Sequence, residues 1–166
     1  MRAIIGMGSN LGDRLAHLRA AVKRLEGIGH VERVSHVYET KPVGGPPQPD
    51  YLNAAALVVY RGEPMDLLDA LQGIESILGR VRGDAYEKWG ARTLDLDILW
   101  LEGIAMESDR LVVPHPRLVE RPFALRPLVD VAPDAIDPVS QLPYTRLFDE
   151  ATAHMVPTPL DLFGAS

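Results

Sequence analysis

Two aspartates, Asp95 and Asp97, occupy alternate positions in an apolar segment, and their chemistry suits a metal ion. Side chains of a strand alternate between its faces, so the two carboxylates share one face while Leu94, Leu96 and Ile98 share the other. Two residues of rise separate the carboxylates by about 6.6 Å, which suits a clamp around two cations about 3.5–4 Å apart. Carboxylate oxygens are the ligands that Mg²⁺ prefers, and nucleotide phosphates usually complete its coordination. The spacing therefore predicts a magnesium site.

A solvent-facing strand would show the same alternation, and an Asp-x-Asp pattern alone favours that simpler explanation. Neighbouring Trp89 and Arg92 favour the metal site instead. Further arginines occur on both sides of the aspartates, and guanidinium groups match phosphate oxygens and stabilise charge in phosphoryl transfer. Each could be an ordinary surface residue, which is the better explanation for Arg117. Together they predict a polyphosphate site, without the GxxxxGK[ST] loop that holds many nucleotides. The set is Arg80, Arg82, Arg92, Arg110, Arg117 and Arg121.

An aromatic ring and an amide stand two residues apart in the run 48–54. Tyr51, at the start of a strand, can stack on a flat heterocycle. Asn53 lies on the same face and offers paired donor and acceptor groups to the edge of that ring. Ordinary packing of Tyr51, with Asn53 bonded to loop backbone, is the simpler alternative. His115, held between two prolines, is equally consistent with a phosphate contact and with a lone surface histidine.

The elements that must position these residues follow from hydrophobic periodicity. A stripe of leucines and valines predicts a helix that ends near Leu25, and Ser9 or Asn10 is expected to cap it. Pro64 begins a second helix, which Gly79 stops. The expected strands cover 2–8, 31–40, 52–60 and 94–101.

The order strand-helix-strand-strand-helix-strand is that of the ferredoxin-like α+β fold, an antiparallel sheet with both helices on one face. Residues 41–50 contain four prolines and two glycines and are expected to form an ordered loop. The final third is a proline-rich extension, with a short helix expected near 123–129. We expect one domain over residues 1–166.

Composition limits the possible functions. The chain has 166 residues, 46% of them hydrophobic, with a net charge of -6, which suits one domain with a real core and speaks against broad nucleic-acid binding. No cysteine is present, so disulfides and thiolate chemistry are excluded, and the scattered histidines speak against zinc. No apolar run reaches the about 18 residues needed to span a bilayer. We therefore expect a cytoplasmic protein that binds neither membrane nor nucleic acid.

Taken together, the motifs resemble the 6-hydroxymethyl-7,8-dihydropterin pyrophosphokinase family of the folate pathway. Each motif alone is weak, but their combination and order are specific, and the similarity extends over about residues 1–130. The longest match is the run from Lys88 to Leu99. The shorter matches lie at 8–10, 49–53, 79–82, 113–115 and 121–123.

This resemblance implies a ferredoxin-like fold and an enzyme whose co-substrate is ATP in complex with two Mg²⁺ ions. The hydroxymethyl oxygen of the pterin would attack the β-phosphorus, and AMP would leave. No separate general base is evident, and metal-assisted positioning is sufficient for this chemistry. The expected partners are small-molecule substrates only, and we expect a monomer.

The resemblance also implies a role for each matched residue. Asp95 and Asp97 would bind magnesium, and Arg82 and Arg92 would act in catalysis. The loop 79–90 would close over both substrates, with Arg82 reaching the transferring phosphates only after closure. The pterin would be contacted by Thr40, Pro42, Val43, Tyr51, Asn53 and Phe123, with the two aromatic rings on its opposite sides. The nucleotide would be contacted by Gln72, Glu75, Arg80, Trp89, Arg92, Ile98, Arg110, Leu111, His115 and Arg121.

Val112 and Pro116 depart from the family pattern, since many members have a hydroxyl and an aromatic side chain there. Two weaker alternatives are a non-catalytic ferredoxin-like module that binds RNA or a regulatory ligand, and a different Asp-x-Asp metal enzyme. The RNA-binding module would require stacking aromatics and a basic face on the sheet. The other metal enzyme, such as a nucleotidyltransferase or glycosyltransferase, would not require the Tyr51–Asn53 segment.

Overall fold

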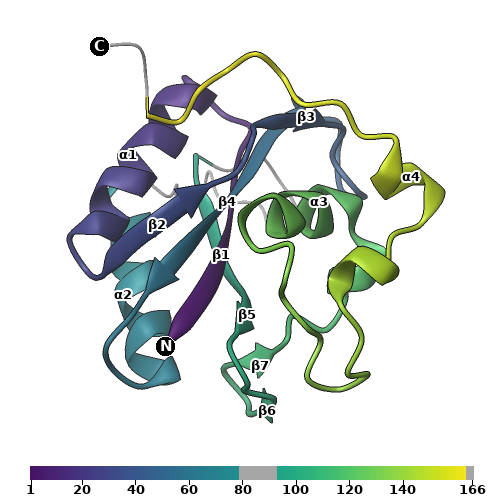
Figure 1. The fold of residues 1–166 in the computed structure, drawn as a ribbon. Helices are drawn as coiled ribbons and strands as arrows, with labels where there is room; N and C mark the ends of the chain where they lie inside the picture. Colours follow the sequence, from purple (N-terminus) through teal and green to yellow (C-terminus); the bar gives the residue numbers. More distant parts are fainter. Residues whose placement is uncertain (79–92, 164–166) are drawn as a thin grey trace.

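An antiparallel sheet of five strands forms the centre of the computed structural model, which describes residues 1–78 and 93–163 (Figure 1). The strands run in the order β2-β4-β1-β5, and β3 pairs with β4 beyond the end of β2. β5 is therefore at one edge of the sheet. The strands are β1 (Arg2–Ser9), β2 (His30–Val34), β3 (Tyr38–Thr40), β4 (Tyr51–Val59) and β5 (Asp95–Leu101).

Two helices, α1 (Arg14–Glu26) and α2 (Pro64–Ile77), cover one face of this sheet (Figure 1). The side chain of Asp13 caps α1 by accepting a hydrogen bond from the Ala16 N–H, so the expected cap at Ser9 or Asn10 is wrong. Pro64 occupies the first turn of α2, as predicted. Apolar stripes of both helices pack on one set of alternating strand residues, among them Ile5, Met7, Ala54, Ala56, Leu96 and Ile98.

The opposite face is covered by α3 (Pro122–Val131), which is the short helix expected near 123–129 and runs longer at both ends. Leu125, Leu128 and Val131 of α3 pack on the other set of strand residues, which includes Ile4, Ala55, Leu57 and Leu99. A β-bulge between β1 and β5 directs both Leu99 and Trp100 to this face. The sheet therefore lies between two helical layers.

The single strand expected over 31–40 is wrong, because the chain leaves the sheet between β2 and β3. Ser35 causes this break. Its hydroxyl accepts a hydrogen bond from the Ala55 N–H at 2.8 Å and donates to the His36 carbonyl at 2.7 Å. The side chain thus takes the place of a backbone acceptor, which is a known way for serine to compete with a strand.

The remaining elements are short, and the tail after them returns to the core. Thr158 donates through both its N–H and its hydroxyl to the Val37 carbonyl, each at 2.8 Å, and Leu162 is only 3% exposed. Within the described residues, no helix is long and apolar enough to cross a bilayer. These short elements are β6 (Met106–Glu107), β7 (Val112–Val113), the 3₁₀ helices η2 (Leu118–Glu120) and η3 (Tyr144–Arg146), and α4 (Glu150–Ala153).

Candidate functional site

The two aspartates of β5 face the α3 side of the sheet. Leu96 and Ile98 pack towards α1 and α2, so the predicted alternation along this strand is confirmed. Asp97 is exposed and Asp95 is half-buried. Both carboxylates could therefore reach a ligand on the α3 side of the sheet.

A row of four cross-strand partners extends from Asp95 through the sheet. Asp95 pairs with Gly8, Gly8 with Asn53, and Asn53 with Tyr38, so all four positions share the α3 face. We call these four residues the polar row. Two strand spacings of about 4.8 Å place Asp95 and Asn53 about 10 Å apart. The row thus brings the predicted metal ligand and the predicted pterin reader to one surface.

Gly8 lies between them and leaves the row open at its centre. A Cβ atom at this position would lie 3.1 Å from the Asn53 Oδ1 atom and 3.4 Å from the ring of Tyr51. Distances this short force the neighbours to move. The absence of a side chain at Gly8 therefore keeps a flat surface beside the amide and the ring, which is the shape that a planar heterocycle requires.

Asn53 is held in a fixed orientation, with 7% of its surface exposed. Its Nδ2 donates to the Thr40 hydroxyl, so the structure brings two predicted pterin contacts together. The following loop contains Pro42, which is half-buried, and Val43, which is 78% exposed.

One residue of this region was not recognised from the sequence as part of the site. The Asn10 side chain is 1% exposed and donates to the Gln48 Oε1 atom at 2.7 Å and to the Pro49 carbonyl at 3.0 Å. It therefore fixes the end of the proline-rich loop just before Tyr51. The Gly-Ser-Asn turn was visible in the sequence, but helix capping explained it equally well.

The beginning of α3 brings two predicted ligand contacts to the same side. Phe123 lies in the first turn of α3, and the guanidinium of Arg121 lies 5.8 Å from the centre of its ring. Tyr51 is on the α3 face of β4, because it alternates with Leu52, which packs with α1 and α2. Both predicted stacking rings are thus on one side of the sheet, and both are half-buried.

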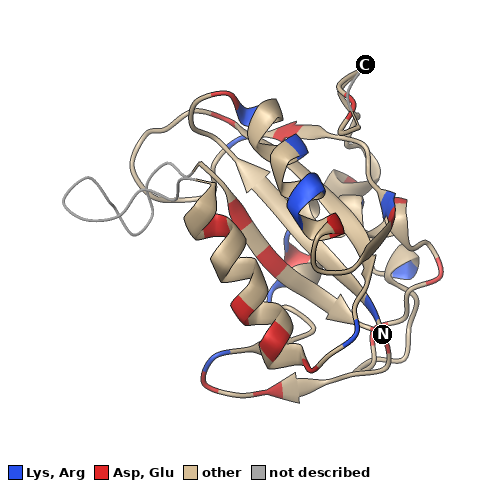
Figure 2. Cartoon of the chain, turned by 90° about the vertical axis from the view of Figure 1, so that its left-hand side faces the viewer, with Lys and Arg blue, Asp and Glu red and all other residues tan. Residues whose placement is uncertain are grey.

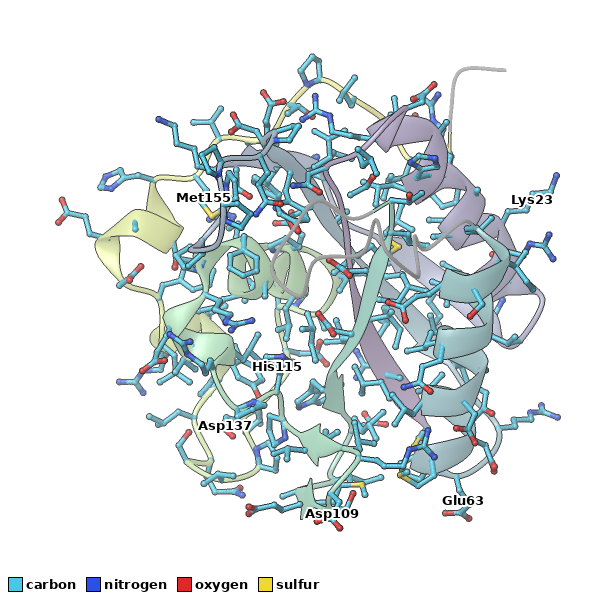
Figure 3. The ribbon with its side chains drawn as sticks, turned by 180° about the vertical axis from the view of Figure 1, so that it is seen from behind. Lys23, Glu63, Asp109, His115, Asp137 and Met155 are labelled. Atoms are coloured by element: carbon cyan, nitrogen blue, oxygen red, sulfur yellow. The ribbon has the colours of Figure 1, made fainter. Side chains whose placement is uncertain are left out.

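His115 lies beside β5, where its N–H donates to the Leu99 carbonyl at 3.0 Å (Figure 3). Burial lowers the pKa of His115 below its ordinary value. The Asp97 carboxylate acts in the opposite direction, while Arg121 and Arg117 lower the pKa further. These influences show that His115, Asp97 and Arg121, which are far apart in sequence, share one electrostatic environment.

A second group of predicted nucleotide contacts lies at the α2 side of β5. Arg110 donates to Asp69 at 2.7 Å and to Gln72 at 3.3 Å. Glu75 is 5% exposed, and its carboxylate accepts the Leu96 N–H at 3.0 Å, so it satisfies a backbone donor of this edge strand. Ile98 and Leu111 are buried in the core beneath α1 and α2. The side chains of Glu75, Ile98 and Leu111 therefore make most of their contacts inside the protein.

Four predicted residues, and the predicted lid, lie outside the described residues: Arg80, Arg82, Trp89, Arg92 and the loop 79–90. Figure 2 shows acidic positions on β5 and α2 and basic positions on α1. Among residues 1–78 and 93–163, no group of three His, Asp or Glu side chains is arranged to hold a metal ion. The pair Asp95 and Asp97 offers only oxygen donors, which fits Mg²⁺ whose other ligands are phosphates and water.

Comparison with known proteins identifies the family of this chain. A model of the family described as 7,8-dihydro-6-hydroxymethylpterin-pyrophosphokinase (HPPK) matches residues 4–133. Two relatives are named 2-amino-4-hydroxy-6-hydroxymethyldihydropteridine pyrophosphokinase. The one from Synechocystis is 40% identical over 150 residues, covering 89% of this chain and 75% of the relative. The one from Haemophilus influenzae is 41% identical over 142 residues, covering 84% and 87%.

A solved Plasmodium falciparum HPPK-DHPS with pteroate has the same fold, with a TM-score of 0.70 at 14% sequence identity. The match covers 92% of this chain but only 42% of that chain, so this chain corresponds to less than half of the Plasmodium protein. The family model and the sequence relatives show that the chain belongs to the 7,8-dihydro-6-hydroxymethylpterin-pyrophosphokinase family.

Proposed function

We infer that this chain transfers the terminal diphosphate of ATP to the hydroxymethyl group of 6-hydroxymethyl-7,8-dihydropterin, with AMP as the second product, in folate biosynthesis. Family membership supports this activity. The observation that supports it in the structure is the polar row, which joins the Asp95 carboxylate to the Asn53 amide across the open Gly8 position. The pterin needs the amide, the polyphosphate needs the metal-binding carboxylate, and the two substrates must lie side by side to react.

The pterin would lie on the Gly8 surface. The Asn53 amide would read its edge, and Tyr51 and Phe123 would stack on its two sides. Thr40 supports this arrangement because its hydroxyl holds the Asn53 amide in one orientation. The amide therefore does not have to lose conformational freedom when the pterin binds. Pro42 and Val43, in the loop that Asn10 fixes, would complete the pocket.

The diphosphate would lie beside Asp95 and Asp97, which would hold the two Mg²⁺ ions that accompany ATP. When bound, Mg²⁺ neutralises charge on the transferring phosphates. His115, whose charge is influenced by both Asp97 and Arg121, would contact the phosphates together with Arg121 from the α3 side. Gln72 and Arg110, which already contact each other, would bind the nucleotide from the α2 side. Holding both substrates in line is the main contribution that the protein makes to this kind of reaction.

Other assignments stay predictions. Glu75, Ile98 and Leu111 would contribute to the nucleotide site, and Arg80, Arg82, Trp89 and Arg92 would act from outside the described residues. We also propose that the sheet with α1 and α2 is a ferredoxin-like core, to which the proline-rich C-terminal part adds α3. A monomeric, cytoplasmic enzyme remains our expectation.

The test is a product assay with purified protein, ATP, Mg²⁺ and 6-hydroxymethyl-7,8-dihydropterin. We expect AMP and the pterin diphosphate in equal amounts, identified by phosphorus NMR and mass spectrometry, and no AMP when the pterin is omitted. Formation of ADP with a pterin monophosphate would show transfer of one phosphoryl group and would contradict the proposal.

An RNA-binding module is disfavoured by one specific observation. Such modules bind bases on an open sheet face, whereas α1 and α2 cover one face here and α3 packs on the apolar part of the other. The part of the α3 face that carries Asp95 and Asp97 would repel a nucleic-acid backbone.

A further inference from the structure

A buried tyrosine joins α3 to the strand next to the pterin reader. Tyr38 is 1% exposed, and its hydroxyl donates to the Asp130 carboxylate of α3 at 2.6 Å. Arg126, one turn earlier in α3, donates to the same hydroxyl at 3.3 Å and lies 3.7 Å from Asp130. The rest of the interface between α3 and the sheet is lined by apolar side chains. Apolar contacts are non-directional, so these hydrogen bonds give the helix a defined position.

The tyrosine connects both walls of the proposed pterin pocket. On the sheet side, Tyr38 is the partner of Asn53 in the polar row and stands two residues before Thr40, to which the Asn53 amide donates. On the helix side, Asp130 and Arg126 belong to the helix whose first turn carries Phe123. A shift of α3 relative to β3 would therefore change the separation between Phe123 and the surface that carries Tyr51 and Asn53.

Pro127 lies inside α3 and weakens the connection between its first turn and the rest of the helix. Proline has no N–H to donate to the carbonyl four residues earlier, which is that of Phe123. The turn with Phe123 therefore lacks one of the hydrogen bonds that would hold it to the rest of the helix. The Leu125 N–H still donates to the Arg121 carbonyl at 2.9 Å, and contacts of α3 with the sheet add to the bonds that hold this turn.

We propose that Tyr38 and Asp130 are a positioning pair that sets the width of the pterin pocket by fixing α3 against β3. This role rests on the proposed function. Neither residue touches the substrate, so the pair acts through Phe123 on one side and Asn53 on the other. Burial, together with the hydrogen bond to Asp130, raises the pKa of Tyr38 to about 12, although Arg126 lowers it. The hydroxyl therefore stays protonated at neutral pH and continues to donate.

The chain offers a matched control in Tyr144. Like Tyr38, it is 1% exposed, and it packs in the apolar cluster between α3 and the sheet. Among the described residues, however, its hydroxyl has no hydrogen-bond partner. Tyr144→Phe removes the same hydroxyl from a similar environment without breaking a bond. It separates the loss of the Tyr38–Asp130 contact from the general effect of deleting a buried hydroxyl.

The experiment compares the variants Tyr38→Phe, Asp130→Ala, Asp130→Asn and Tyr144→Phe. Dissociation constants are measured by calorimetry for a non-reactive pterin analogue and for a non-hydrolysable ATP analogue, and thermal unfolding is measured in parallel. We expect Tyr38→Phe and Asp130→Ala to weaken pterin binding by about fivefold, the effect of losing one hydrogen bond. ATP-analogue binding should change by less than about twofold in the same variants.

Rescue by a conservative change sharpens this test. Asp130→Asn keeps an oxygen that accepts from the tyrosine hydroxyl, so its pterin affinity should stay close to that of the wild type. The double variant Tyr38→Phe/Asp130→Ala should lose no more pterin affinity than either single change, because both remove the same bond. Tyr144→Phe should bind both ligands normally.

Several outcomes would overturn the proposal. Equal weakening of pterin and ATP binding, or a lowered unfolding temperature with unchanged pterin affinity, would show that the pair only stabilises the fold. A loss in Tyr144→Phe as large as that in Tyr38→Phe would show the same. A wild-type chain that binds no pterin analogue would overturn the proposed function together with the pair. If the wild type and Tyr38→Phe bind the pterin analogue with equal affinity, only the positioning role of the pair is overturned.

Discussion

The two faces of the central sheet are made by the same strands but carry different kinds of side chain. Towards α1 and α2, the strands present a continuous apolar surface from Leu96 and Ile98 to Ala54 and Ala56. Towards α3, the surface is apolar near Ile4 and Leu57 and becomes polar at Asp95, Asn53 and Tyr38. One face is therefore used for stability along its whole length, whereas the other is divided between stability and ligand contacts.

This difference shows how one sheet can carry both a core and the proposed site. Because successive residues of a strand point to opposite faces, Asp95 and Asn53 are each flanked along their strands by buried apolar neighbours. The backbone beneath the site is fixed by the core that packs against α1 and α2. A side chain on the α3 face can thus be replaced without loss of the fold. The following substitutions test this difference between the two faces.

Asp97→Ala should have the largest effect on activity. The side chain is exposed and lies on the α3 face, so its removal leaves the core intact. Loss of one of two carboxylates should lower turnover by at least about 100-fold, since metal-held charge is worth several kcal/mol in the transition state. AMP release measures this effect, and circular dichroism measures the fold. Glu107→Ala, at an exposed carboxylate of β6, is the control. Near-normal turnover of Asp97→Ala at limiting Mg²⁺ would exclude the metal role.

Gly8→Ala tests the open centre of the polar row. The added methyl group would lie 3.1 Å from the Asn53 Oδ1 atom and against the Tyr51 ring, so we expect pterin affinity to fall by at least about tenfold. Gly73→Ala in α2 is the matched control, because a Cβ there has no neighbour within 4 Å. That change should raise stability by about 0.5–1 kcal/mol, as expected for replacing a helical glycine. Unchanged pterin binding in Gly8→Ala would place the pterin elsewhere.

Phe123→Ala and Tyr51→Ala should each weaken pterin binding more than ATP binding. Aromatic stacking contributes about 0.5–1.5 kcal/mol beyond area burial, so a loss of roughly three- to tenfold in pterin affinity is expected from this term. Titrations with pterin and ATP analogues separate the two ligands. A larger loss for the nucleotide would mean that these rings line the other half of the site.

Glu75→Ala should show the smallest effect on ligand binding and a clear effect on stability. Its carboxylate is buried and accepts the Leu96 N–H. Removal leaves that donor unpaired, which should lower the free energy of unfolding by about 1–3 kcal/mol. Glu75→Gln keeps an acceptor oxygen and should recover most of this loss. Urea denaturation measures the stability, and a large loss of ATP affinity without destabilisation would favour a direct nucleotide contact instead.

Local patterns in the sequence predicted the parts of the fold that depend on neighbouring residues. The alternation around Asp95 predicted which side chains of β5 share a face, and the proline at position 64 predicted the start of α2. The break at Ser35 was missed because it depends on a hydrogen bond to Ala55, 20 residues away. The cap of α1 was misplaced because several residues in this turn have suitable side chains, and only the path of the backbone selects Asp13.

The candidate site depends even more than the fold on contacts between residues that are distant in the sequence. Family motifs indicated Asn53 and Thr40 separately, but the bond between them requires the register of β3 and β4. The proximity of His115 to Asp97 depends on how the chain after β7 passes along β5. Burial of Glu75 and Leu111 also depends on tertiary packing, whereas the alternation along β5 already placed Ile98 on the apolar face.

The position of β1 has a consequence for how the chain folds. β1 is synthesised first, yet it lies between β4 and β5, and its last partner is Leu101. The edge of β1 that faces β5 therefore lacks its partner until Leu101 has left the ribosome, whereas β4 can pair with the other edge earlier. Sheets with such distant pairings form slowly, and an unpaired apolar strand is prone to associate with other chains in the meantime. β1, which lies inside the finished sheet, thus depends on protection during synthesis until β5 is available.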